Sequence, residues 1–165
     1  MSLTKKEIKA CIFDLDGVIV DTAKYHYLAW KETANSFNIE FNEHDNEQLK
    51  GVSRIASLEF ILNKGNVKLS KKDFEHALKD KNNLYLSYIS QIDSSELLPG
   101  VLEFLTELKE KSIKIGLGSA SKNAQIILER TGINSFFDIV IDGNKVTESK
   151  PNPMVFKKGA DGLKI

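Results

Sequence analysis

Two different periods of apolar residues divide the chain. Residues 9–14 (KACIFD) form a short apolar run that ends in acids and a glycine, which is typical of a buried strand. From about residue 20 to residue 92 the apolar residues recur at spacings of three and four, and this period predicts helices. The helices are expected to begin after residues that favour N-caps and to continue to about Ile92; these residues are Thr22, Asn42, Ser53 and Ser70.

Beyond residue 92 the pattern changes to alternating helices and strands. Pro99-Gly100 precedes a helix in which Leu102, Leu105 and Leu108 are expected to face inward. The elements predicted after it are a strand at 113–119, a helix at 121–130, a strand at 136–142 and a helix from 153 to about 163. A strand, a helix and a strand with short connections form a βαβ unit, so we expect a parallel sheet.

These elements predict an α/β fold. The expected architecture is a Rossmann-like core with a parallel sheet, interrupted between its first and second strands by an inserted α-helical cap domain. We expect the core to comprise residues 1–19 and 93–165, and the cap to comprise residues 20–92.

Composition excludes several classes of partner. The 165 residues include 23 basic and 23 acidic side chains, so no net charge attracts nucleic acid or an anionic membrane. The lone cysteine, Cys11, excludes a disulfide within the chain. No apolar run is long enough for a membrane span, and the first residues do not form a signal peptide, so a cytoplasmic location is expected.

Asp14 and Asp16 stand at the end of the first predicted strand. Residues two apart in a strand point to the same side, so both carboxylates can face one site. Ligands of open parallel sheets bind beyond the carboxyl ends of the strands, and Gly17 lets the chain turn away at this point. Two acids here suit a hard cation held by oxygen ligands; the alternative is a surface turn that happens to contain two acids.

Ser119 and Lys150 follow the second and third predicted strands. A serine between a strand and a helix can help to bind an anion, although such a residue is more often only a helix-entry residue, and a lysine in this place is more often only a loop residue. Two acids, a hydroxyl and a lysine at three successive strand ends together indicate phosphoryl transfer, in which one carboxylate attacks phosphorus.

Three stretches of the chain resemble the first three motifs of the haloacid dehalogenase superfamily of phosphotransferases: FDLDGVIVDT, SASKN and ESKP. Within this superfamily, YHYLAWK, LKGVSR and SASKN are similar to the β-phosphoglucomutase family, and the likeness extends from about Lys9 to Pro153. The resemblance implies an isomerase that interconverts β-D-glucose 1-phosphate and glucose 6-phosphate through an aspartyl-phosphate and a bound bisphosphate.

The resemblance also implies a role for each matching residue. Asp14 would be the nucleophile and Asp16 the general acid/base, and the Asp14 carboxylate and the Asp16 backbone carbonyl would hold Mg²⁺. Ser119 and Lys150 would bind the transferring phosphoryl group. A second phosphate site would consist of Arg54 from the cap together with three core residues, Ser121, Lys122 and Asn123.

Lys81 occupies a position in the apolar stripe of the long cap helix. Periodicity alone favours a side chain whose stem covers the core while its ammonium lies in water, whereas the resemblance implies an ammonium that points at the active site. His26 lies one turn from Trp30; a histidine there is usually structural, but the resemblance implies that it couples cap closure to Asp16. The positions that match substrate-lining or hinge residues are Thr22, Trp30, Gly51, Val52 and Ser57.

The family's fourth motif, an acidic pair after the next strand, does not occur before the chain ends at GADGLKI. We expect truncation to account for this, ahead of a clipped protein or a partner chain that supplies the rest. Without the fourth strand, the first strand has an unpaired apolar edge, which predicts self-association there, whereas a full-length form is expected to be a monomer.

Two other functions stay open. A sugar-phosphate phosphatase of the same superfamily would pass the phosphoryl group to water, but Arg54 and SASKN favour the mutase, because a hydrolase needs no second phosphate site. The other possibility is an inactive fragment that binds sugar phosphates or nothing, because its metal shell is incomplete. The expected partners are small sugar phosphates, namely glucose phosphates and glucose 1,6-bisphosphate, with no nucleic acid and no membrane.

Overall fold

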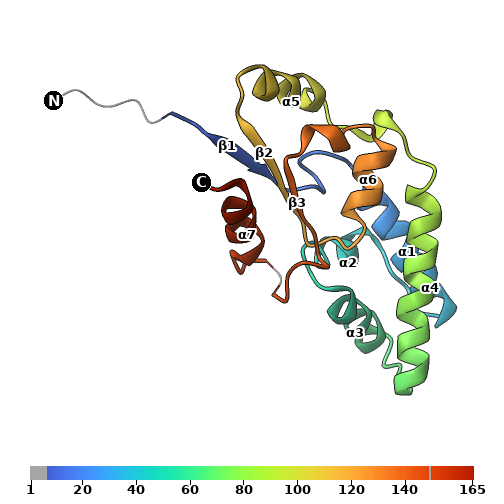
Figure 1. Cartoon of the computed structure of the whole chain (residues 1–165). Helices are drawn as coiled ribbons and strands as arrows, with labels where there is room; N and C mark the ends of the chain where they lie inside the picture. Colours follow the sequence, from blue (N-terminus) through green and yellow to red (C-terminus); the bar gives the residue numbers. More distant parts are fainter. Residues whose placement is uncertain (1–6, 149) are drawn as a thin grey trace.

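The structure is a computed structural model that describes residues 7–148 and 150–165 (Figure 1). Three strands form a parallel sheet in the order β1-β2-β3. The strands are β1 (Ala10–Phe13), β2 (Lys114–Gly118) and β3 (Ile139–Ile141). The helices are α1 (Ala23–Ser36), α2 (Glu43–Glu47), α3 (Arg54–Lys64), α4 (Lys71–Ile89), α5 (Val101–Glu110), α6 (Ala124–Arg130) and α7 (Met154–Leu163), with short 3₁₀ turns at Ser94–Glu96 and Asn134–Phe136.

The two faces of β2 pack against different helices, because side chains alternate along a strand. Ile115 and Leu117 are fully buried in a cluster that includes residues of α5 and α6. Gly116 and Gly118 point the other way, where a side chain at either would come within 3.2–3.3 Å of neighbours that include Leu163 and Phe156. The absence of side chains at these glycines lets α7 approach the sheet closely, and Figure 1 shows α7 on one side with α5 and α6 on the other.

Four helices, α1 to α4, follow one another between β1 and β2, as the apolar period predicts. The side chains of Asn42, Ser53 and Ser70 each accept a hydrogen bond from a backbone N–H three residues further on, so these three predicted caps are confirmed. Some buried residues of α1 and α4 join those of α3 in a separate apolar cluster, which includes Trp30, Leu58 and Ile61. The boundaries of the cap at residues 20 and 92 stay a prediction.

Three sequence predictions about the second half were wrong in detail. Leu102 is 47% exposed, whereas its neighbour Val101 is buried together with Leu105 and Leu108, so the buried stripe of α5 begins one residue earlier than expected. The helix expected from residue 121 begins at Ala124. The strand expected at 136–142 is limited to Ile139–Ile141, because residues 134–136 form a 3₁₀ turn.

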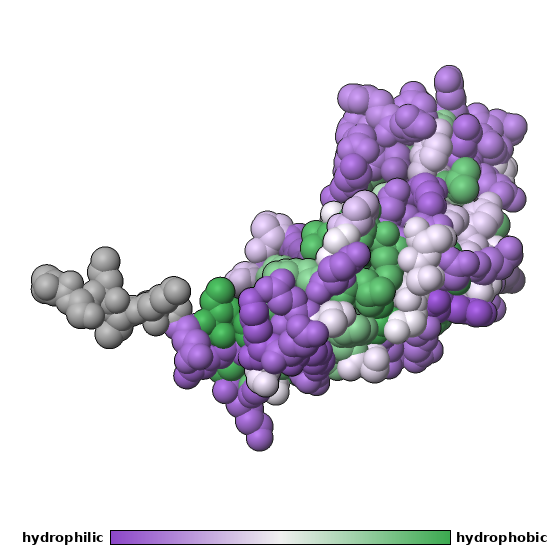
Figure 2. Space-filling model, turned by 90° about the horizontal axis from the view of Figure 1, so that it is seen from above, coloured by the Kyte–Doolittle hydropathy of each residue, from purple (hydrophilic) through white to green (hydrophobic). Residues whose placement is uncertain are grey.

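One edge of β1 has no partner strand among the described residues, because β1 is the outer strand of the sheet. The predicted open edge is therefore present, while the predicted self-association through it stays a prediction. Figure 2 views the molecule from the side on which α5 lies in Figure 1 and shows apolar side chains gathered between polar ones. Val18, Leu102 and Phe104 are exposed apolar residues of the first loop and of α5. No helix in the described ranges is both long and apolar enough to span a bilayer.

The burial pattern of α5 gives a direct test of its orientation. Leu105→Ala should lower the free energy of unfolding by about 2–5 kcal/mol, because it leaves a cavity in the main core. Leu102→Ala on the same helix is the matched control and should cost less than about 1 kcal/mol, because Leu102 is largely exposed. Urea unfolding of both variants measures the difference, and equal losses would contradict this packing.

Candidate active site

The loop after β1 presents two acids around a buried anchor. Leu15 is fully buried, and its carbonyl accepts hydrogen bonds from the N–H groups of Val18, Ile19 and Val20, which folds the chain into a tight turn. Gly17 has φ +77°, a conformation that a residue with a side chain rarely adopts. Asp14 and Asp16 therefore lie on either side of the anchor, at the carboxyl end of β1.

Asp14 forms an ion pair with Lys150, with 2.7 Å between Lys150 Nζ and Asp14 Oδ1. Oδ1 also accepts a hydrogen bond of 2.8 Å from the Leu15 N–H. Lys150 lies in the segment that follows β3, and its ammonium is also 5.0 Å from the ring centroid of Phe156. The parallel order of the strands thus brings a residue after the third strand into contact with a residue after the first, as predicted for strand ends at one sheet edge.

Asp16 is bonded to Thr22 rather than to Lys150. The Thr22 hydroxyl donates a hydrogen bond to Asp16 Oδ1. Thr22 precedes α1, but its side chain makes no capping hydrogen bond, so the sequence prediction was right about the position and wrong about the role of the hydroxyl. Burial raises the pKa of Asp16 above its ordinary value, the Asp14 charge adds to this rise, and the Thr22 hydrogen bond opposes it.

Ser119 lies just beyond β2 and is buried. Leu117 pairs with Phe13 in the sheet, so Ser119 and Asp14 come from neighbouring strand ends. The Ser119 hydroxyl accepts a hydrogen bond of 3.0 Å from the Ser121 N–H, and the Ser121 hydroxyl accepts one of 3.2 Å from the Asn123 N–H. These bonds hold residues 119–123 as a turn and explain why α6 begins later than predicted.

On the cap side, Lys81 is buried at 3% exposure, so its ammonium does not reach solvent as periodicity alone suggested. Its Nζ lies 3.0 Å from His26 Nδ1 and 4.4 Å from the ring centroid of Trp30. The His26 ring stacks on the Tyr85 ring, with 4.0 Å between centroids and 17° between planes. Two helices, α1 and α4, thus contribute a packed group of a lysine, a histidine and two aromatic rings.

The charges in this group are poorly compensated. Burial, together with the positive charges of Lys81 and Arg54, lowers the pKa of His26 to about 3. The pKa of Lys81 is lowered to about 7 by burial and by the positive charge of Arg54, against the opposing effect of the negative charge of Asp16. Arg54 is half-buried at the start of α3, and burial lowers its pKa as well. Lys81 and Arg54 therefore place two positive charges near His26, and Asp16 of the core is the acid whose negative charge favours the protonated form of Lys81.

The other predicted residues are placed as follows. Gly51 and Val52 are exposed, in the segment before α3, and Gly51 has φ +75°. Ser57 is buried inside the cap. Lys122 is exposed, in the turn after β2. Arg54 makes no hydrogen bond to Ser121, Lys122 or Asn123 within the described parts of the chain, so the predicted second phosphate site stays a prediction.

Two residues near the site did not stand out in the sequence. The Asn123 amide donates a hydrogen bond of 3.3 Å to Asn82 Oδ1 and so links the core turn to α4 of the cap. Tyr85 lies one turn after Lys81 on α4, and its hydroxyl is buried without a hydrogen-bond partner among the described residues. Asn82 follows Lys81 directly and Tyr85 lies one turn after it. Only this proximity to Lys81 could have drawn attention to the two residues.

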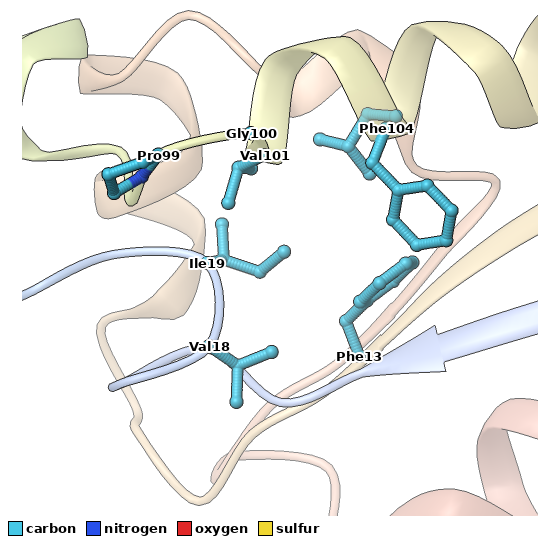
Figure 3. A pocket seen from close by; sticks show the side chains of 8 residues that line it. Phe13, Val18, Ile19, Pro99, Gly100, Val101 and Phe104 are labelled. Atoms are coloured by element: carbon cyan, nitrogen blue, oxygen red, sulfur yellow. The ribbon is translucent and has the colours of Figure 1, made fainter.

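An apolar hollow beside the sheet does not contain these residues. A cavity of about 330 Å³ lies between the loop after β1 and the start of α5, and Figure 3 shows side chains that line it, among them Phe13, Val18 and Phe104. The rings of Phe13 and Phe104 meet edge to face, with 5.9 Å between centroids. This hollow is an apolar groove without acids or cations, so the candidate chemistry lies elsewhere, between the strand ends and the cap.

The donors available to a cation are oxygens of the first loop. The backbone carbonyl of Asp16 accepts no hydrogen bond from the described residues, and the Asp14 carboxylate lies two positions before it. In the described ranges, no group of three or more histidine, cysteine, aspartate or glutamate side chains is arranged to hold a metal ion. Mg²⁺ commonly uses one or two carboxylates together with water and substrate phosphate, and these oxygens fit that requirement.

Comparison with known proteins now defines the class. Residues 11–165 match the family of haloacid dehalogenase-like hydrolases, and the chain belongs to this family. The family resemblance that the motifs predict is therefore confirmed.

Within this family, the chain is similar to β-phosphoglucomutases. It is 43% identical over 160 residues to the β-phosphoglucomutase of Bacillus subtilis, across 96% of this chain and 71% of that protein. The crystal structure of β-phosphoglucomutase from Clostridium difficile matches with a TM-score of 0.89 and 45% identity, across 96% of this chain and 72% of that chain. This match confirms the predicted fold class, a Rossmann-like core with a helical cap.

A fructose-1-phosphate phosphatase of Escherichia coli is 29% identical over 147 residues, across 88% of this chain and 74% of that protein.

The low pKa of Lys81 predicts how stability depends on pH. Unfolded, Lys81 keeps its proton up to about its ordinary pKa of 10.5, whereas folded it loses the proton near pH 7. Between these values the unfolded state binds more protons, so stability should rise with pH, by at most about 1.4 kcal/mol per pH unit. Urea unfolding at pH 7, 8 and 9 should show that Lys81→Met removes this rise, whereas the exposed Lys79→Met on the same helix keeps it. The same slope in Lys81→Met and the unaltered protein would contradict the burial of this charge.

Proposed function

We propose that this protein is a phosphoglucomutase that interconverts β-D-glucose 1-phosphate and glucose 6-phosphate through an aspartyl-phosphate and a bound bisphosphate. The observation that supports it most directly is the ion pair between Asp14 and Lys150, at a strand-end site opposite the cap cations Lys81 and Arg54. Two anionic groups on one sugar would compensate these cations. The similarity to two β-phosphoglucomutases supports the same function.

Asp14 is the nucleophile in this proposal. Its Oδ1 is fixed by Lys150 and the Leu15 N–H, whereas its Oδ2 accepts no hydrogen bond from the described residues. The free oxygen keeps its lone pairs for attack on phosphorus, which forms the aspartyl-phosphate while the sugar oxygen leaves. Lys150 and the Ser119 hydroxyl then bind the oxygens of the transferring group.

The Asp14 carboxylate and the Asp16 backbone carbonyl would hold Mg²⁺. The bound ion would supply positive charge that neutralises the phosphoryl oxygens.

Asp16 is the general acid/base in this proposal. Its carboxyl lies two residues from the nucleophile, and burial raises its pKa toward the range in which a carboxyl can both donate and accept a proton. Thr22 holds the carboxyl through its hydroxyl. Asp16 would give a proton to the leaving sugar oxygen and would take one from the sugar hydroxyl that attacks the aspartyl-phosphate.

The phosphate that is not being transferred needs a second anion site. We propose that Arg54 of the cap and the turn at Ser121, Lys122 and Asn123 provide it. A mutase needs this site because its bisphosphate must turn and bind with either phosphate at Asp14. Trp30, Gly51, Val52 and Ser57 would line the sugar or act as hinge positions, and His26 would link cap closure to Asp16.

A sugar-phosphate phosphatase is the second candidate, because a fructose-1-phosphate phosphatase is among the relatives of this chain. It would use Asp14 and Lys150 in the same way but transfer the phosphoryl group to water. The buried cap group at Lys81, His26 and Trp30 favours the mutase, because a dry cap limits hydrolysis of the aspartyl-phosphate. A cytoplasmic location and a monomeric state stay predictions.

The products separate the two functions. With β-glucose 1-phosphate, Mg²⁺ and a trace of glucose 1,6-bisphosphate, glucose 6-phosphate should exceed released inorganic phosphate by at least about tenfold, the ratio that a barrier difference of about 1.4 kcal/mol gives. A coupled dehydrogenase assay and a phosphate stain of the same sample measure both. Asp16→Asn should slow formation of glucose 6-phosphate by about 100-fold or more, since it removes the proton transfer. Mainly inorganic phosphate would favour the phosphatase, and no product of either kind would favour an inactive fragment.

A further inference from the structure

The segment directly after β3 holds the turn that follows β2. The Gly143 N–H donates a hydrogen bond of 3.1 Å to the Ser121 carbonyl, and the Asn144 amide donates one of 3.0 Å to the Lys122 carbonyl. A Cβ atom at residue 143 would collide with the Ala120 carbonyl oxygen, so glycine is needed for the two segments to approach this closely. Two consecutive carbonyls of the turn are therefore bound by the segment after β3.

Asp142 fixes the Asn144 side chain in this position. Asp142 is buried at the carboxyl end of β3, where its Oδ1 accepts a hydrogen bond of 3.0 Å from the Asn144 N–H and its Oδ2 accepts one of 3.3 Å from the Asn144 amide. The amide nitrogen has two hydrogens, which match its two acceptors, the Asp142 carboxylate and the Lys122 carbonyl. The amide oxygen could donate to neither acceptor, so these neighbours determine the orientation of the side chain.

The bound carbonyls matter because of the ligand that the turn is proposed to bind. Carbonyl oxygens carry partial negative charge and repel an anion, whereas N–H groups, hydroxyls and ammonium groups attract it. The two hydrogen bonds keep the carbonyl oxygens of Ser121 and Lys122 on the side of the segment after β3. The Asn123 amide instead reaches Asn82 of the cap. The carbonyls and the polar side chains of the turn thus have different neighbours.

We propose that Asn144 is a positioning residue: held by Asp142, it orients the turn at residues 121–123 so that the turn presents donors rather than carbonyl oxygens to the second phosphate. Asn144 acts through the Lys122 carbonyl and does not contact the phosphate itself. The inference rests on the proposed function, in which this turn and Arg54 bind the phosphate that is not being transferred.

Asn144→Ala tests the proposal, because it removes the amide at an exposed position. Affinity for β-glucose 1,6-bisphosphate should fall about fivefold, as expected for one hydrogen bond, and calorimetry measures it in an Asp14→Asn background that cannot take up the phosphoryl group. The melting temperature without ligand should change by less than about 2 °C, as expected for a surface substitution.

A second readout separates positioning of the turn from a general structural effect. Acetyl phosphate carries one phosphoryl group, which needs only the Asp14 site: Asp14 attacks phosphorus and acetate leaves. The rate at which acetyl phosphate with Mg²⁺ phosphorylates Asp14 should be the same in the Asn144→Ala protein and the unaltered protein.

Lys122→Ala provides a third measurement, because Lys122 is the cationic residue whose backbone Asn144 holds. In a Lys122→Ala background, Asn144→Ala should lower the affinity for bisphosphate by less than about twofold, since the ammonium that the turn positions is gone. Additive losses in the double variant would contradict the proposal.

Asn134→Ala is the matched control, since Asn134 is an exposed asparagine of the core whose Oδ1 accepts a hydrogen bond from Gln125. It should change neither the affinity nor the rate. Unchanged bisphosphate affinity in Asn144→Ala would overturn the role of Asn144 and leave the proposed function intact. An equal fall in bisphosphate affinity and in the acetyl phosphate rate would also overturn it, as a general structural effect. If the Asp14→Asn protein binds no bisphosphate, or acetyl phosphate leaves Asp14 of the unaltered protein unlabelled, the proposed function fails and this inference fails with it.

Discussion

The contact between Asp14 and Lys150 connects residues 136 positions apart in the sequence, and the candidate site depends on it. It requires that β1 and β3 run parallel on either side of β2, so that the segments after both strands lie at one edge. It also requires α7 to pack closely, because α7 follows Lys150 directly and rests on the glycines of β2. The fold class and the placement of charge in the site are therefore two consequences of one topology.

The cap contributes charge rather than shape. Lys81 and Arg54 bring positive charge into a buried region in which His26, with its low pKa, is neutral. Holding such charges apart from water costs free energy, and we propose that an anion that binds between cap and core compensates them. The same anion would join two parts of the protein that the described structure connects by few polar contacts, among them the Asn123–Asn82 hydrogen bond.

The sequence predicted best the features that depend on near neighbours. The caps at Asn42, Ser53 and Ser70 could be predicted because each bond spans three residues. The inward position of Leu102 was wrong because adjacent apolar residues, here Val101 and Leu102, leave the phase of a helix ambiguous. The late start of α6 depends on hydroxyls that bind backbone N–H groups inside the turn, which no apolar period records.

The contacts of the site were less predictable. Asp14, Asp16 and Lys150 stood out because parallel strand ends meet at one edge, but the pairing of Asp14 with Lys150 and of Asp16 with Thr22 depends on the folded positions of these side chains, which the sequence does not specify. Tyr85 looked like one more apolar position in the stripe of α4, since its partners lie far away in the sequence. The polar end of an aromatic side chain has no signal in a hydrophobic period.

The central claim is that Asp14 carries the phosphoryl group, and its most direct test is peptide mapping by mass spectrometry after incubation with β-glucose 1,6-bisphosphate and rapid acid quenching. The account predicts one added phosphoryl group in the peptide that contains Asp14, located on Asp14 itself by reduction of the acyl phosphate with borohydride. Label on another residue, or turnover of glucose phosphates by an Asp14→Asn protein, would contradict it.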